Sequence, residues 1–204
     1  MKKKWLIIGL GNPGGNYSHT RHNAGFLILD EIAKNLNISF CNEKFSGVFA
    51  KYETENEECY FGKPLTYMNR SGLFVKNFIK KYNIPMHNVI VLHDDIAFPV
   101  GVSKIKLGGS SGGHKGINSI IEECSSQDFI RVRIGVGENS SYKIIDWVVS
   151  CFDQKEEQQI LSQSDKIQEA ISLIISNQLT KAMNEFNSKK NNTNKSAESK
   201  FNCT

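Results

Sequence analysis

The sequence predicts a single α/β domain in which a twisted, mixed and largely parallel β-sheet carries helices on both faces. Two observations predict this fold class. Short continuous apolar runs at residues 5–10 and 88–92 are typical of strands buried on both faces of a parallel sheet. Segments with apolar residues at every third or fourth position alternate with such runs, as expected of helices that cover a sheet. The length of 204 residues suits one domain of this kind.

The first part of the chain reads as a strand, a helix, a hairpin and a second helix. The strand at 5–10 ends in a glycine-rich loop, and the amphipathic pattern of a helix begins at residue 24 and ends near residue 37. Residues 48–52 and 59–62 resemble strands joined by an acidic turn, which predicts an antiparallel hairpin. A second helical stripe runs from Leu73 to Tyr82 and stops before Pro85.

The second part continues the alternation and ends in helices. We expect strands at 88–92, 102–107 and 130–136, a second glycine-rich loop at 108–116 and a short helix at 117–123. One helical stripe joins Ile160 to Ile174, and another joins Leu179 to Phe186. Residues 189–204 are polar and low in complexity, which predicts a disordered tail behind a domain of residues 1–188.

Composition narrows the class of protein. With 39% hydrophobic and 23% charged residues, the chain is typical of a soluble globular protein, and its net charge of +4 permits a polyanionic partner. Five cysteines stand singly, so we expect neither a disulfide framework nor a zinc knuckle. No segment reaches transmembrane length, and the apolar run behind the first lysines is interrupted by glycine too early for a signal peptide. These features predict a cytoplasmic protein.

The first loop matches G-x-G-x-x-G at Gly9, Gly11 and Gly14, the pattern of dinucleotide-binding loops. In that motif the glycines open a helix directly, because the pyrophosphate sits at the N-terminus of the helix. Here turn-forming sequence follows, and the helical pattern starts only at residue 24. Asp30, at the spacing of the ribose-binding acid, falls inside the helix. We therefore interpret the loop as one that presents other side chains, including His22.

Loops that leave the carboxyl ends of parallel strands converge on one crevice, which would bring His22 close to Asp94. A carboxylate beside a histidine fixes its tautomer and raises its basicity, as a general base requires. Alternatively His22 caps the following helix, or Asp94 and Asp95 bind a metal with His93, although no matching His or Glu spacing supports a metal. Because G-x-S-x-G is absent and no cysteine lies in a glycine-rich loop, water is the expected nucleophile of any hydrolysis.

Four segments in order closely resemble the bacterial peptidyl-tRNA hydrolase family. They are GLGNPGGNYSHTRHNAGF, GKPLTYMNRSG, HDDIAFPVGVSKIKLGGSSGGHKG and FIRVRIGVG, and LTKAMNEFN is similar to the last helix of that family. The resemblance covers roughly residues 5–188. It implies a monomeric α/β enzyme without metal or organic cofactor that cleaves the ester between a peptide and the 3′ ribose of tRNA. The expected partner is thus peptidyl-tRNA, through its acceptor stem, 3′ end and nascent peptide.

The resemblance also assigns roles to residues of this chain. It implies that His22 is the base that activates water and that Asp94 is the carboxylate that orients this base. Asn12 and Asn69 match amides of the peptide channel, and Asn12 favours N-blocked substrates. An amide can donate to a developing oxyanion without adding charge to the site.

Further positions match the part of the family that binds tRNA. Tyr17 and Tyr67 correspond to aromatic residues that contact tRNA, where rings can stack on bases, and Met68 fits an apolar channel wall. Lys104, Lys106 and Arg133 suit phosphate contacts, although lysines on a strand usually form only a solvated face.

The second glycine-rich loop resembles a mobile gate, and its residues His114 and Lys115 are expected to contact substrate. Two positions depart from the family pattern: Lys115 stands where an asparagine is typical, and Ala97 stands where an aspartate is common. The first departure concerns the residue that helps to position water and that makes polar contacts from the gate. A different class of function also remains, a non-catalytic RNA-binding protein on this fold, similar to organellar splicing factors.

Overall fold

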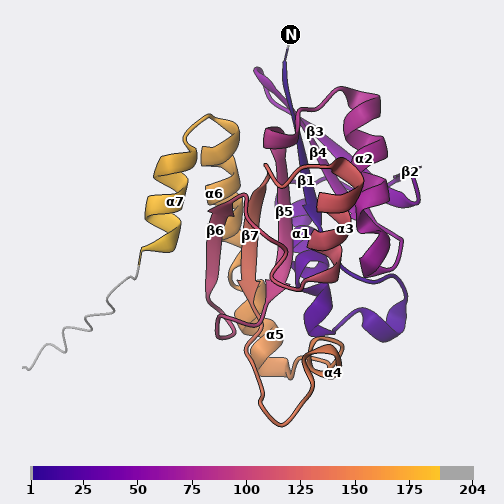
Figure 1. Ribbon diagram of the computed structural model, residues 1–204. Helices are drawn as coiled ribbons and strands as arrows, with labels where there is room; N and C mark the ends of the chain where they lie inside the picture. The colour runs from indigo at the N-terminus through magenta and orange to yellow at the C-terminus, as the bar shows by residue number, and fades with distance from the viewer. Residues whose placement is uncertain (1, 189–204) are drawn as a thin grey trace, which may run out of the picture.

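A seven-stranded mixed sheet forms the centre of the computed structural model, which describes residues 2–188 (Figure 1). The strands are β1 (Lys3–Gly9), β2 (Asn42–Lys44), β3 (Gly47–Glu53), β4 (Glu57–Pro64), β5 (Val89–Asp95), β6 (Ser103–Leu107) and β7 (Ile130–Gly135). Their order across the sheet is β2-β3-β4-β1-β5-β7-β6. The central strands β4, β1, β5 and β7 are parallel, whereas the outer pairs β2–β3, β3–β4 and β6–β7 are antiparallel.

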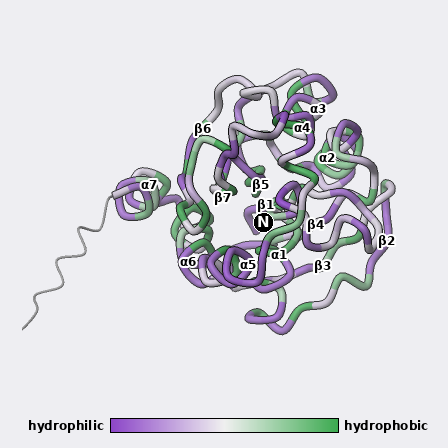
Figure 2. The backbone as a smooth tube through the Cα atoms, turned by 90° about the horizontal axis from the view of Figure 1, so that it is seen from below, coloured by the Kyte–Doolittle hydropathy of each residue, from purple (hydrophilic) through white to green (hydrophobic). Residues whose placement is uncertain are grey.

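Helices cover both faces of this sheet (Figure 2). One face packs against α1 (Ala24–Asn35), α5 (Gln154–Leu161) and α6 (Ser164–Ile175), and α7 (Leu179–Asn187) contacts α6 and the edge strand β6. The other face packs against α2 (Ser71–Tyr82) and α3 (Lys115–Cys124). The short helix α4 (Ile144–Val148) lies beyond the carboxyl ends of the parallel strands (Figure 1). The predicted fold class is therefore confirmed.

Strand β1 explains why a continuous apolar run predicts a central strand. Trp5 and Ile7 belong to the hydrophobic core under α1 and α6, whereas Leu6 and Ile8 belong to the core under α2 and α3. Successive side chains of a strand point to opposite faces, so a strand with a core on each side needs apolar residues at every position.

Several predicted elements need correction in their bounds. The single stripe that joins Ile160 to Ile174 is divided between α5 and α6, and α5 begins with a capping box formed by Asp153 and Glu156. Strand β5 continues to Asp95, so the triplet of residues 93–95 ends the strand instead of following it. Helix α3 begins at Lys115, two residues before the predicted start. The sequence pattern did not predict the three-residue edge strand β2.

Two glycines bring the start of α1 against the ends of β1 and β5. A Cβ atom on Gly25 would lie 2.4 Å from the carbonyl oxygen of Leu92 and 2.5 Å from the backbone nitrogen of Leu10. A Cβ atom on Gly9 would lie 2.3 Å from the carbonyl oxygen of Gly25. Only glycine permits this close approach of backbones, and the approach places the turn before α1 beside the end of β5.

Within residues 2–188, no helix is both long and apolar enough to cross a lipid bilayer. The tail predicted at residues 189–204 lies outside the described residues.

Candidate active site

A buried histidine–carboxylate pair lies at the carboxyl end of β5. His22 belongs to the turn Arg21–Asn23 directly before α1, and Asp94 is the penultimate residue of β5. The Nδ1 atom of His22 lies 2.8 and 2.9 Å from the two carboxylate oxygens of Asp94. The side chains are 10% and 3% exposed, respectively. The expected contact between these residues is thus confirmed, and His22 donates its Nδ1 proton to the carboxylate.

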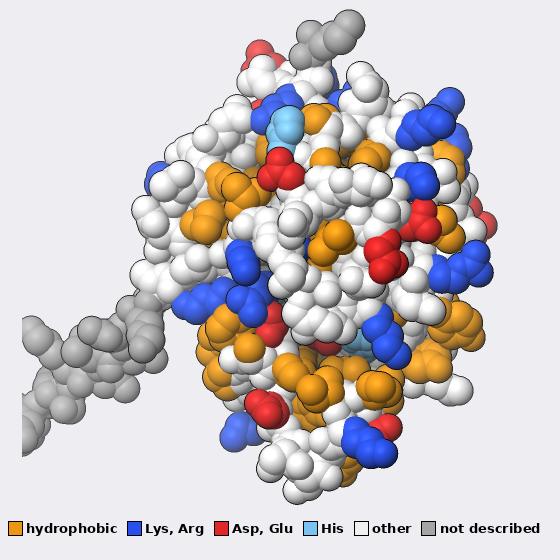
Figure 3. All heavy atoms as spheres, viewed as in Figure 1, with side chains coloured by type: hydrophobic (Ala, Val, Ile, Leu, Met, Phe, Trp, Pro, Cys, Tyr) orange, Lys and Arg blue, Asp and Glu red, His pale blue; other side chains and the backbone are white. Residues whose placement is uncertain are grey.

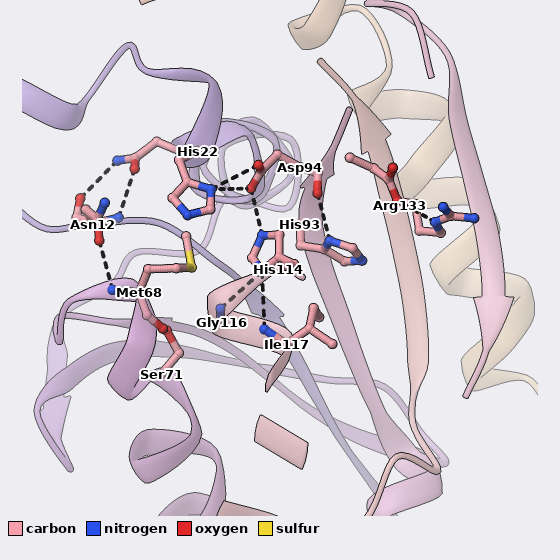
Figure 4. Close-up of polar contacts among 12 residues, drawn as sticks. Asn12, His22, Met68, Ser71, His93, Asp94, His114, Gly116, Ile117 and Arg133 are labelled. Carbon is pink, nitrogen blue, oxygen red and sulfur yellow. Dashed lines mark hydrogen bonds and ion pairs between the residues drawn. The ribbon is translucent and has the colours of Figure 1, made fainter. Parts of the chain in front are cut away.

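His114 is a second histidine on the same carboxylate, and its backbone environment determines which nitrogen carries the proton. Its Nδ1 atom accepts the backbone N–H groups of Gly116 and Ile117, which caps the N-terminus of α3. A neutral imidazole that accepts at Nδ1 must carry its proton at Nε2. The Nε2 atom therefore donates to Oδ1 of Asp94 at 2.8 Å (Figure 4).

The two histidines keep Asp94 ionised although the carboxyl group is buried. Burial alone would raise the pKa of Asp94, but the electrostatic interactions with His22 and His114 and the hydrogen bonds that these rings donate outweigh it, and the pKa lies well below its usual range. Neighbouring His93 shows the opposite balance, because burial and the nearby His114 hold its pKa well below the ordinary value. The site thus combines a carboxyl group that favours its ionised form with His93, a buried histidine that favours its neutral form.

The hydrogen bonds of the cluster suit proton transfer better than metal binding. His22, Asp94 and His114 bring potential ligand atoms within 4.8 Å of one another. However, the nitrogens of His22 and His114 that face Asp94 carry protons, whereas a metal ligand must offer a lone pair. To ligate through Nε2, His114 would have to place its proton on Nδ1, against the two N–H donors of α3. The arrangement leaves the Nε2 atom of His22 as the basic position.

Asn12 presents a hydrogen-bond donor beside this base. Its Oδ1 atom accepts the backbone N–H of Met68 at 2.8 Å, and because that partner can only donate, the atom facing it must be the oxygen. The backbone N–H and carbonyl of Asn12 are both bonded to the side-chain amide of Asn23. Among the described residues nothing accepts from Nδ2 of Asn12, so the amide offers its NH₂ group to the site.

These groups open into a cavity of about 650 Å³ at the carboxyl end of the sheet. The lining contains most of the residues that the sequence singled out: Asn12, His22, Tyr67, Met68, Asn69, Asp94, Lys106, His114, Lys115 and Arg133. Ala97, one of the two departures from the family pattern, also lines it. The loops after β1 and β5 therefore converge as predicted.

Two of the singled-out residues lie outside this lining. Tyr17 sits in the turn Gly15–Tyr17 and is half-buried. The ammonium group of Lys104 donates to the backbone carbonyl of Asn187, at the end of α7, at 2.6 Å. A phosphate contact would require Lys104 to leave this partner, so its predicted role depends on the resemblance alone.

The resemblance assigned no role to three groups that line the cavity. Arg131 donates to the carbonyl oxygens of Gly109 and Ser110 and so anchors the second glycine-rich loop. His93 packs edge-on against His114, with 4.8 Å between ring centroids. Four apolar residues form the third group: Ile144, Ile145, Val148 and Val149. In the sequence this group appears as the mainly apolar run I-I-D-W-V-V at residues 144–149, which is too short to be recognised as a helix.

The surface around the cavity combines charge and apolar area. Figure 3 shows Lys and Arg side chains gathered over β6 and β7, and hydrophobic side chains gathered below them over the α4 segment. Ile144 and Ile145 are 62% and 61% exposed, and Tyr67 is 62% exposed. Arg133 is held at this surface by Asp95, whose carboxylate lies 2.6 Å from its Nε atom.

Comparison with known proteins agrees with this geometry. The sequence model of the family described as "Peptidyl-tRNA hydrolase" matches residues 6–195 of the chain. The peptidyl-tRNA hydrolase of Mycoplasmopsis agalactiae is 45% identical over 182 residues, which cover 89% of this chain and 95% of the relative. That of Bacillus subtilis is 37% identical and covers 90% and 98%. The crystal structure of peptidyl-tRNA hydrolase from Acinetobacter baumannii superposes with a TM-score of 0.85 at 34% identity, covering 92% and 96%.

Proposed function

The chain belongs to the peptidyl-tRNA hydrolase family and hydrolyses the ester of peptidyl-tRNA, and from this premise we propose how its residues carry out the reaction. The proposal rests above all on one observation, the contact of His22 Nδ1 with both oxygens of Asp94 at the rim of the cavity. This contact makes His22 a general base for water.

The hydrogen bond to Asp94 determines the tautomer of the base. With its proton on Nδ1, His22 carries a lone pair on Nε2, the ring atom that points away from Asp94 in Figure 4. Nε2 removes a proton from water as the water oxygen attacks the ester carbonyl carbon. The ionised carboxylate stabilises the imidazolium that forms, as an orienting carboxylate does in other acyl-transfer sites.

The attack produces a tetrahedral intermediate with a negative oxygen. The NH₂ group of Asn12 is free to donate to this oxygen or to the adjacent peptide carbonyl, and Asn69 offers a second amide. The intermediate collapses with cleavage of the bond to the ribose 3′ oxygen, which takes the proton from Nε2 of His22. The products are a peptide with a free carboxyl group and a tRNA with a free 3′ hydroxyl, and water is consumed.

The cavity wall and rim support separate sites for the two halves of the substrate. Met68 and the apolar residues of α4 suit the nascent peptide, and Tyr67 can stack on the exposed 3′-terminal bases. Lys106 and Arg133 suit phosphates of the acceptor stem, with Lys104 and Tyr17 as further contacts outside the cavity. His114 and Lys115 are proposed to meet the substrate from the gate loop. Lys115 places a cation where an asparagine is typical, and this cation can contact either a phosphate or the oxyanion.

We further propose that the protein acts as a cytoplasmic monomer that recycles tRNA from aborted translation. A non-catalytic RNA-binding role is not favoured, because the family relatives are hydrolases by name and both the base and its carboxylate are present. The assay that separates these functions follows release of free tRNA from N-acetyl-aminoacyl-tRNA in the presence of EDTA. We expect turnover without added metal, and slower turnover of aminoacyl-tRNA with a free amino group. Binding of RNA without any turnover would favour the non-catalytic role.

A further inference from the structure

Arg21, the neighbour of His22 in sequence, is a buried arginine that the mechanism above does not use. Its side chain is 5% exposed. One terminal nitrogen donates to both carboxylate oxygens of Glu156, at 2.8 and 2.7 Å, and the other donates to the backbone carbonyl of Cys151 at 2.5 Å. Cys151 belongs to the segment that connects α4 to α5, and Glu156 lies in the first turn of α5. The guanidinium group therefore links the loop of His22 to this distant segment of the chain.

Aromatic rings complete the environment of Arg21. The central carbon of its guanidinium group lies 3.8 Å from the ring centroid of Trp147, in α4, and 5.0 Å from that of Phe152. The indole N–H of Trp147 donates to the carbonyl oxygen of Gly137 at 2.8 Å. A planar guanidinium group can stack on a ring while its edge donates hydrogen bonds, which the ammonium group of a lysine cannot do.

The backbones of the two segments are also paired, but only briefly. Thr20 and Cys151 form an isolated antiparallel bridge, flanked by the bond from the N–H of Arg21 to the carbonyl of Ser150 and by that from Phe152 to His19. Helix α4 has only five residues, and none of them is buried. So short a helix with no buried side chain depends on outside contacts for its position.

We propose that Arg21 is a positioning residue that fixes the α4 wall of the cavity, formed by Ile144, Ile145 and Val148, relative to His22. It thereby sets the affinity for the peptide part of the substrate. The proposal rests on the proposed function, since it assigns the α4 wall to the peptide. Ile144 and Ile145 line the same cavity as His22, so a displacement of α4 removes apolar contacts from a bound peptide. Arg21 acts through these residues and not on the reacting atoms.

The base itself has anchors that do not involve Arg21. His22 is held by Asp94, and the following residue, Asn23, is bonded through its side chain to the backbone of Asn12. Loss of the Arg21 guanidinium should therefore change substrate binding more than the chemical step. A purely structural role would instead lower the amount of active enzyme and affect every substrate equally.

The experiment compares wild type and Arg21→Lys on N-acetyl-phenylalanyl-tRNA and N-acetyl-glycyl-tRNA. We expect KM for the phenylalanyl substrate to rise about tenfold, as for the loss of an apolar pocket contact. We expect kcat and the pH profile to stay close to those of wild type, and KM for the glycyl substrate to change little. An equal loss on both substrates, or a loss confined to kcat, would overturn the proposal. A wild type that hydrolyses neither substrate would instead contradict the proposed function.

A double-mutant cycle keeps the test independent of folding. Ile145→Ser alters an exposed residue of the α4 wall, and if Arg21 acts through this wall, the effects of the two substitutions on KM are less than additive. Full additivity would contradict the inference. Lys63→Met is a matched control, because Lys63 pairs with Asp30 and lies 4.4 Å from the ring centroid of Phe40 without lining the cavity. It should leave the ratio of the two KM values unchanged.

Discussion

The exchange Asp94→Asn should inactivate the enzyme by changing the tautomer of His22. Because Nδ1 of His114 must accept the N–H groups of α3, its Nε2 proton requires an acceptor at the position of Oδ1. The new amide therefore places its oxygen there and its NH₂ group at the position of Oδ2, 2.9 Å from Nδ1 of His22. Two donors then face each other, and His22 relieves the conflict by moving its proton to Nε2.

A neutral histidine protonated at Nε2 has its lone pair on Nδ1, so Nε2 can no longer accept a proton from water, and the charge that stabilised the imidazolium is also lost. General-base catalysis contributes about 10²- to 10⁴-fold in rate, or roughly 3–5 kcal/mol, and kcat should fall by this amount.

The assay measures kcat on N-acetyl-aminoacyl-tRNA, together with ¹⁵N chemical shifts of the His22 ring nitrogens, which report the tautomer. Asp30→Asn is the matched control, because Asp30 lies on α1 and pairs with Lys63 outside the cavity. A kcat within threefold of wild type in Asp94→Asn, or an Nδ1-protonated His22 in that variant, would refute the reasoning.

Other consequences follow from burial and charge. Because the pKa of buried His93 is depressed, the unfolded chain binds a proton at a higher pH than the folded chain does, so the free energy of unfolding should fall as pH drops below about 6.5. In His93→Asn, the free energy of unfolding from urea titrations should change less between pH 7 and 5 than in the wild type. Gly25→Ala should cost about 1–3 kcal/mol of unfolding free energy in thermal scans, because its Cβ meets the backbone of Leu92, whereas Gly15→Ala, with open space around it, should be neutral. Lys106→Ala should weaken tRNA binding and reduce the slope of log Kd against log salt by about one, and an unchanged slope would exclude a phosphate contact.

The sequence predicted the parts of the fold that depend on burial and on local chain geometry. The run at residues 5–10 identifies β1 because a strand between two cores must be apolar at every position. The helical stripe from Ile160 to Ile174 was misleading, because apolar spacing continues across the junction of α5 and α6 while the capping box at Asp153 marks only the start of α5. Periodicity reports which face is buried and not where a helix is interrupted.

The active site was predictable where topology brings strand ends together, as for His22 and Asp94. It was not predictable where a side chain acts through backbone contacts formed only in the folded state. His114 fixes its tautomer by capping α3, and Arg21 reaches Glu156 from a segment far away in sequence. Arg131 anchors the second glycine-rich loop by donating to two of its carbonyl oxygens, a role that no sequence pattern indicates. Such contacts depend on tertiary structure and carry no local signature.

The most direct test of the central claim is the rate of tRNA release from N-acetyl-aminoacyl-tRNA by His22→Ala, measured in EDTA beside the wild type. Because alanine offers no lone pair to accept the proton of water, we expect near-complete loss of turnover in the variant, while tRNA binding is retained. Hydrolysis undiminished in His22→Ala would contradict the assignment of His22 as the base.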